Sequence, residues 1–175
     1  MDSKFSVIPS IRDHYNTLVA IDEPDQPFWP DYIVLLGVPA AAGVAVGLTL
    51  HLRDMASYIA GVAIFTALLF ALVIHVFQLR MQLLSHPSVP RDGQLARFID
   101  QLFANVNYAV VVGVIASGVS MAAAITADGD GRINGIWSGL VVCLGIHLLL
   151  VVFMCIKRVR AAYREIRLLP RHSPV

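Results

Sequence analysis

Four long apolar runs constrain this chain more than any other feature of its sequence. They cover approximately residues 32–52, 58–79, 108–127 and 136–156, and each reaches the roughly 18–20 residues that a helix needs to cross a bilayer. Inside lipid the backbone must satisfy its own hydrogen bonds, so each run is expected to be helical. The composition agrees, because only 14% of the residues are charged, whereas soluble domains carry about 25%. We therefore predict an all-α membrane protein with four transmembrane helices.

Lysine and arginine are distributed unevenly between the two sides of these predicted helices. Eleven of the thirteen lie in residues 1–30, 80–107 and 157–175, whereas the other two connections hold only Arg53 and Arg132. The positive-inside rule therefore predicts that both termini and the central connection are cytoplasmic. We expect a multi-pass protein of the inner (plasma) membrane, in which residues 31–156 form two tandem helical hairpins between an N-terminal segment and a basic tail.

The two predicted hairpins share a sequence pattern. The segment YIVLLGVPA at residues 32–40 agrees with YAVVVGVIA at residues 108–116 at five of nine positions, and LVIH at 72–75 resembles LGIH at 144–147. Matches of valine and alanine arise readily by chance between apolar segments, but the tyrosine, glycine and histidine matches favour a common origin. We interpret the pattern as a tandem duplication of a two-helix unit.

Small and hydroxyl-bearing residues mark expected packing faces. Gly43 and Gly47 have GxxxG spacing in the first apolar run, and Gly113 lies on a similar face of the third. Small residues let helix backbones approach closely in lipid. We expect this packing to occur within one four-helix bundle, and a subunit interface is the alternative. The residues that an oligomeric pore would place along a wet path are Thr49, Thr66, Ser117 and Ser120.

Two segments outside the apolar runs have amphipathic helical patterns. In residues 94–107, Phe98 and Phe103 belong to an apolar stripe, and Asn105 belongs to the other faces. This segment is expected either to lie on the membrane surface or to continue directly into the third span. Near the N-terminus a shorter stripe is formed by Ile11, Tyr15, Leu18 and Val19. A helix this short is not stable alone in water, so it needs lipid, another cytoplasmic segment or a neighbouring subunit as its partner.

The tail after the fourth run is strongly basic. Its expected contacts are with anionic lipid headgroups, and no motif indicates nucleic acid. Besides Phe98 and Phe103, the residues expected to make cytoplasmic contacts are Arg158, Arg160, Arg164 and Arg167.

His75 and His147 each interrupt a long apolar run. Such residues usually face the interior of a bundle, and the simplest role is a hydrogen bond between helices. A proton or ion path is one alternative. Another is ligation of a b-type haem by the two imidazoles. With histidines on two of four spans the chain resembles small four-span cytochromes b, which implies an electron-transfer or membrane-anchor subunit. The expected depths of His75 and His147 in the bilayer differ by roughly 7 Å at 1.5 Å per residue, which disfavours their binding to one haem.

The remaining motifs do not indicate catalysis. The segment DGDGRING at 128–135 resembles a calcium loop, but Arg132 stands where an oxygen ligand is needed, so a glycine-rich turn is expected. We find no catalytic motif and expect neither an enzyme nor a bound metal. We predict a non-enzymatic protein that oligomerises, alone or with a partner subunit, and forms or gates an ion-conducting pore. In layout it resembles small four-span effectors that permeabilise membranes in bacterial defence. A scaffold subunit of a larger complex is the remaining alternative.

Overall fold

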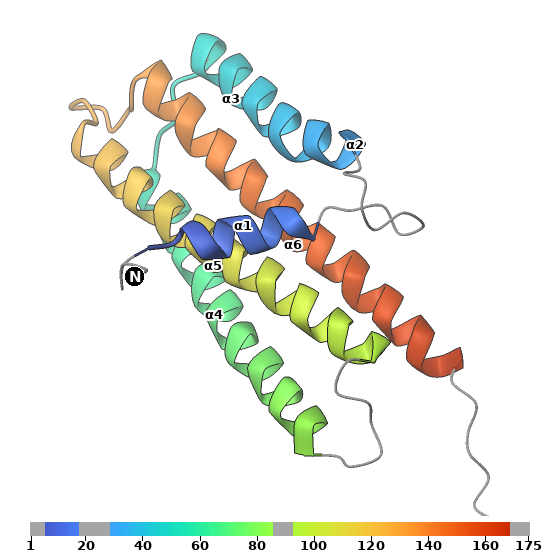
Figure 1. Ribbon diagram of the computed structural model, residues 1–175. Helices are drawn as coiled ribbons and strands as arrows, with labels where there is room; N and C mark the ends of the chain where they lie inside the picture. Colours follow the sequence, from blue (N-terminus) through green and yellow to red (C-terminus); the bar gives the residue numbers. More distant parts are fainter. Residues whose placement is uncertain (1–5, 18–28, 86–92, 169–175) are drawn as a thin grey trace, which may run out of the picture.

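Four helices that are long and apolar enough to cross a membrane form the body of the protein (Figure 1). The structure is a computed structural model that describes residues 6–17, 29–85 and 93–168. Within those ranges the regular elements are helical. In chain order they are α1 (Ile8–Asn16), α2 (Trp29–Tyr32), the π-helical turn η1 (Ile33–Gly37), α3 (Val38–Thr49), α4 (Met55–Ser85), α5 (Gln94–Ile125) and α6 (Gly135–Leu168). The first predicted span is thus built from three consecutive pieces, α2, η1 and α3.

The long helices pack in an order that differs from their order in the sequence. α3 packs against α6, α6 packs against α5, and α5 packs against α4 (Figure 1). The structure does not show the predicted hairpin for the first pair, because α3 and α4 each make their extensive contacts with other helices. We call the contact between two packed helices a seam. The two outer seams, α3 with α6 and α4 with α5, each join the first helix of one predicted repeat to the second helix of the other.

The seam between α3 and α6 is a contact between backbones. A Cβ atom added at Gly43 would lie 2.7 Å from the carbonyl oxygen of Gly139, and one added at Gly47 would lie 3.0 Å from that of Gly135. No side chain fits at such distances, so the four glycines determine how closely the helices approach. Gly43 and Gly47 therefore lie at a close helix contact within a single chain.

The seam between α4 and α5 combines one small residue with side chains. Gly113 of α5 faces the Thr66 side chain of α4, whose Cγ2 would be 3.0 Å from an added Cβ. Toward the other end of the seam, Nε of Arg80 lies 2.8 Å from Oδ1 of Asp100 in an exposed ion pair. This ion pair joins α4 and α5 between one and two turns from the end of α4 and from the beginning of α5.

The two short connections at the opposite end of the bundle bind each other through their backbones. The amide of Ile133 donates to the carbonyl oxygen of Leu52 at 3.0 Å. In the glycine-rich connection, Oδ1 of Asp128 accepts from the amides of Asp130 and Arg132, and Gly131 has a φ of 72°, which glycine adopts without steric cost. The prediction of a glycine-rich turn is confirmed.

The segment from residue 94 to 107 is continuous with the third span. α5 runs without interruption from Gln94 to Ile125. At 1.5 Å per residue it is about 48 Å long, which exceeds the roughly 30 Å hydrocarbon core of a bilayer. Of the two arrangements expected for this segment, the structure has the continuous helix, and α6 likewise continues to Leu168.

Candidate functional site

The most unusual region of the protein is where α1 crosses α5 (Figure 1). Ile11 and Tyr15 of α1 pack against the main apolar cluster, which includes Leu35, Val106 and Val151. The partner that the sequence demanded for this short helix is thus another part of the same chain. Leu18 and Val19, the other members of its predicted stripe, lie outside the described residues.

His14 is fully buried at this crossing and binds Asn105 of α5. The His14 Nδ1 atom lies 2.8 Å from Oδ1 of Asn105, and both side chains are 0% exposed. The hydroxyl of Thr17 lies 2.6 Å from the His14 carbonyl oxygen and 2.9 Å from the same Asn105 oxygen. Asn105 also donates through Nδ2 to the carbonyl oxygen of Gln101 at 2.7 Å. One amide side chain therefore connects the end of α1 to α5.

The chemistry of these partners fixes the protonation of His14. Because Oδ1 of Asn105 only accepts, Nδ1 of His14 must donate and carries the proton. The other ring nitrogen, Nε2, is buried without a hydrogen-bond partner. Burial lowers the pKa of the imidazole from 6.5 to about 4, because the charged form would lose its hydration; His147 and Arg158 lower the pKa further, whereas the bond to Asn105 opposes the shift. The docked form of α1 therefore holds a neutral His14.

A second histidine continues the network beneath His14. The His14 ring stacks on Tyr108 with centroids 3.9 Å apart and planes 12° apart. The Tyr108 hydroxyl lies 2.8 Å from Nε2 of His147, and Nδ1 of His147 lies 2.9 Å from the carbonyl oxygen of Leu35. A carbonyl oxygen only accepts, so Nδ1 donates and Nε2 receives the tyrosine proton. Helix α1 is thus linked through Tyr108 to α6 and η1.

Proline explains why the Leu35 carbonyl needs this histidine. In an α-helix this oxygen would accept from the amide four residues later, but that residue is Pro39, which has no N–H. Pro39 is itself fully buried and is the second residue of α3, just after η1, as expected of a distorted helix near proline. His147 supplies the missing donor, which is how membrane proteins satisfy backbone groups freed by proline.

Further contacts hold the two ends of α1. Arg158 of α6 donates to Oε1 of Gln101 at 3.1 Å and also to the carbonyl oxygen of Thr17. A guanidinium at the C-terminal end of a helix is favourable for its free carbonyl groups. Near the beginning of α1, Nδ2 of Asn107 donates to the Ser10 hydroxyl at 2.8 Å. We call His14, Thr17, Asn105, Tyr108 and His147 the docking cluster.

The structure does not bring His75 and His147 together as haem ligands. The His75 side chain is exposed on α4, and α4 packs on α5. Both ring nitrogens of His147 are already hydrogen-bonded, whereas an axial ligand needs a free lone pair. The expected interhelical hydrogen bond is present at His147. Among the described residues, no group of three histidine, cysteine or acidic side chains is arranged to hold a metal ion.

The four hydroxyl residues predicted for a wet path donate to their own helices. In each case the hydroxyl bonds the carbonyl oxygen four residues earlier, at 2.6 to 2.9 Å. This local bonding satisfies the donor without a partner helix or water. These hydroxyls are Thr49, Thr66, Ser117 and Ser120.

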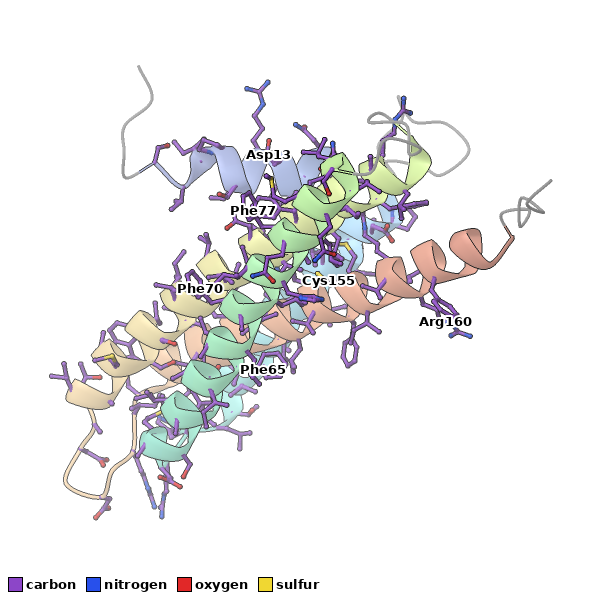
Figure 2. The ribbon with its side chains drawn as sticks, turned by 90° about the horizontal axis from the view of Figure 1, so that it is seen from below. Asp13, Phe65, Phe70, Phe77, Cys155 and Arg160 are labelled. Atoms are coloured by element: carbon purple, nitrogen blue, oxygen red, sulfur yellow. The ribbon has the colours of Figure 1, made fainter. Side chains whose placement is uncertain are left out.

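The predicted cytoplasmic contact residues have different environments. Phe98 is half-buried and Phe103 is exposed. Arg158 belongs to the contacts of α1, whereas Arg160 projects from α6 away from the other helices (Figure 2). The side chains of Arg164 and Arg167 lie outside the described residues.

Sequence analysis missed the central residues of the cluster. It placed Asn105 on a face other than the apolar stripe, but Asn105 is fully buried, because the helix that covers it comes from 91 positions earlier in the chain. It gave no role to His14. One usable signal was present: Pro39 frees a carbonyl group inside a span, and that group needs a donor from another part of the chain.

Comparisons with protein-family models, with curated proteins and with solved structures returned no match. The interpretation of the docking cluster therefore rests on its own geometry.

Proposed function

We propose that this is a non-enzymatic membrane protein that assembles into an oligomer and forms or gates an ion-conducting pore, with α1 as its controlling helix. The observation that carries this proposal is the docking cluster. A short helix outside the spans is held by buried hydrogen bonds, and these reach α5, α6 and η1. Any factor that releases α1 would leave Oδ1 of Asn105 on α5 without its partners and remove the ring stacked on Tyr108, which makes α1 suited to bias two arrangements of the bundle.

Burial within the spans supports assembly into an oligomer. In the most apolar windows of the α3 and α4 spans only 17% of the residues are buried, against 39% for α5 and 33% for α6. Phe70 and Phe77 of α4 are more than half exposed (Figure 2), and His75 on the same helix is also exposed. An ionisable side chain in a span normally faces protein or a wet cavity. In the proposed assembly a neighbouring subunit or the pore covers His75.

The sidedness in this proposal follows from the charges. With the positive-inside rule, α1, the outer turns of α4 and α5 and the tail after α6 lie in the cytoplasm, at the inner (plasma) membrane. The docking cluster then lies near the cytoplasmic surface, where a protein partner or a change in pH reaches it.

Ion leakage from liposomes tests the proposal. Asn105→Leu removes the acceptor of His14 and Thr17 and releases α1, while Arg12→Gln changes an exposed residue on α1 and serves as the matched control. We expect a discrete oligomer in mild detergent and a several-fold change in leakage for Asn105→Leu alone. A monomer that leaks no ions in either form would contradict the proposal and leave a scaffold subunit as the function.

The electron-transfer alternative has weaker support. It requires His75 and His147 to share one haem, and His147 is committed to Tyr108 and Leu35. A haem absorption band in the purified protein that disappears in His147→Ala would support the electron-transfer alternative.

A further inference from the structure

A groove of about 210 Å³ lies beside the docking cluster, between the beginning of the first span and α6. Its floor is apolar and includes Val34, Leu150, Phe153 and Met154. Two charged residues, Asp31 and Lys157, complete its lining. Both are exposed, so the groove combines one negative and one positive side chain with an apolar surface.

The position of the two charges matches the level of lipid headgroups. Asp31 immediately precedes the first apolar run, and Lys157 immediately follows the fourth. Leu150 lies seven residues before Lys157, which places it about 10 Å deeper along α6. The groove therefore runs from the polar boundary of the bilayer into its apolar part.

Neither charge is neutralised by an ion pair within the described part of the chain. The described residues contain one ion pair, between Arg80 and Asp100. Asp31 lies in the field of Arg158, but the guanidinium of Arg158 is bonded to Gln101 and to the Thr17 carbonyl oxygen. Asp31 and Lys157 are thus available to a ligand that carries both signs of charge.

We propose that this groove binds a zwitterionic phospholipid with a primary ammonium group, of the phosphatidylethanolamine type. Lys157 binds the phosphate, Asp31 accepts hydrogen bonds from the ammonium, and one acyl chain lies on Val34, Leu150 and Phe153. A primary ammonium has three N–H donors for a carboxylate, whereas the quaternary ammonium of a choline lipid has none. A lipid with net negative charge would be attracted by Lys157 but repelled by Asp31.

The size of the groove agrees with a lipid ligand. Pockets that enclose a drug-sized molecule usually measure about 300–1,000 Å³, so this smaller groove holds only part of its ligand. A phospholipid needs no more, because its second chain remains in the bilayer. The bound lipid would touch Leu35, whose carbonyl group is held by His147, and so would contact the residue that links η1 to the docking cluster.

Lipid-dependent thermal stability and lipid retention in native mass spectrometry test this site. Purified protein is mixed with phosphatidylethanolamine, phosphatidylcholine or phosphatidylglycerol of identical acyl chains. We expect phosphatidylethanolamine to be retained about fivefold better than the other two, equivalent to about 1 kcal/mol. In Asp31→Asn, phosphatidylethanolamine should no longer be retained better than phosphatidylglycerol. Lys157→Gln should weaken retention of all three lipids.

Arg160→Gln is the matched control, because Arg160 is an exposed base on the same helix outside the groove. It should leave the order of the three lipids unchanged. The proposal is overturned if wild-type protein retains phosphatidylglycerol as well as phosphatidylethanolamine, or if Asp31→Asn keeps the wild-type preference. These results do not depend on ion leakage, so they are separate from the proposed pore.

Discussion

The docking cluster and the exposed face of α4 contain histidines in similar local sequences but opposite environments. His147 ends LGIH and is 8% exposed, with both ring nitrogens bonded. His75 ends LVIH and is exposed. The difference lies in the partner helix. Under the repeat interpretation, the residue that matches Pro39 is Ile115, whose amide can serve its own helix. At the matching position of the seam between α4 and α5 there is therefore no free carbonyl group for His75 to bind. A missing N–H on a neighbouring helix can thus determine the role of a histidine.

The largest expected effect is the loss of stability in His147→Ala. This change leaves the Tyr108 hydroxyl and the Leu35 carbonyl group without partners and opens a cavity. Each unsatisfied buried group costs about 1–3 kcal/mol, so we expect a total of about 3 kcal/mol in the free energy of unfolding. Unfolding by denaturing detergent in bicelles measures it. An equal loss in His75→Ala would show that the two environments do not differ as described.

A smaller effect is expected from acid on the docking of α1. The docked His14 has a pKa lowered to about 4, whereas the released imidazole has the ordinary value of about 6.5. Between these values the released state binds the additional proton, so docking weakens as the pH falls through this window. The charged groups facing a protonated ring include Arg158 and, when protonated, His147.

The expected weakening is about 2 kcal/mol by pH 4.5. Hydrogen exchange of the α1 amides in nanodiscs, followed from pH 7 to 4.5, measures it. His14→Gln keeps a donor for Asn105 but does not titrate, so its exchange should lose most of this pH dependence. If the wild type and His14→Gln respond identically to acid, the buried neutral histidine is not the cause.

A double-mutant cycle sharpens the explanation based on proline. Pro39→Ala restores an N–H that can bond the Leu35 carbonyl oxygen, so this oxygen no longer depends on His147. The destabilisation by His147→Ala should then be smaller in the Pro39→Ala background by about 1 kcal/mol. The same unfolding assay measures this coupling. Strict additivity of the two changes would refute the proposed link between Pro39 and His147.

The smallest expected effect is that of His75→Ala on the stability of the single chain. Substitution of an exposed side chain, as His75 is, usually changes stability by less than about 0.5 kcal/mol. Under the proposed assembly the same variant should nevertheless alter the oligomer distribution in mild detergent. An unchanged distribution would show that His75 does not lie in a subunit interface.

The spans and their close packing could be predicted from the sequence, because they depend on local properties. Apolar length predicted four long helices, and the GxxxG spacing identified Gly43 and Gly47 as a packing face. The choice of neighbours could not be predicted in this way. The partner glycines, Gly135 and Gly139, begin the last span, and nothing local to α3 selects them over the helix that follows it.

The docking cluster depends on even more distant residues. The amphipathic pattern put Asn105 outside the apolar stripe, and so it gave no reason to expect that this residue is buried. Its burial follows from α1, which covers it from 91 positions away. The pattern did show that α1 needed a partner, but its stripe of apolar residues gave no indication that His14 would provide the polar contact.

Crosslinking of α1 to α5 in the membrane is the most direct test of the docking that underlies this account. Ser10 and Asn107 are hydrogen-bonded, so Ser10→Cys and Asn107→Cys place two thiols at the crossing in a Cys143→Ala/Cys155→Ala background. We predict efficient intramolecular crosslinking by a short bis-maleimide, and its loss on adding Asn105→Leu. If both thiols react with monofunctional maleimide but do not crosslink to each other, α1 is not docked on α5.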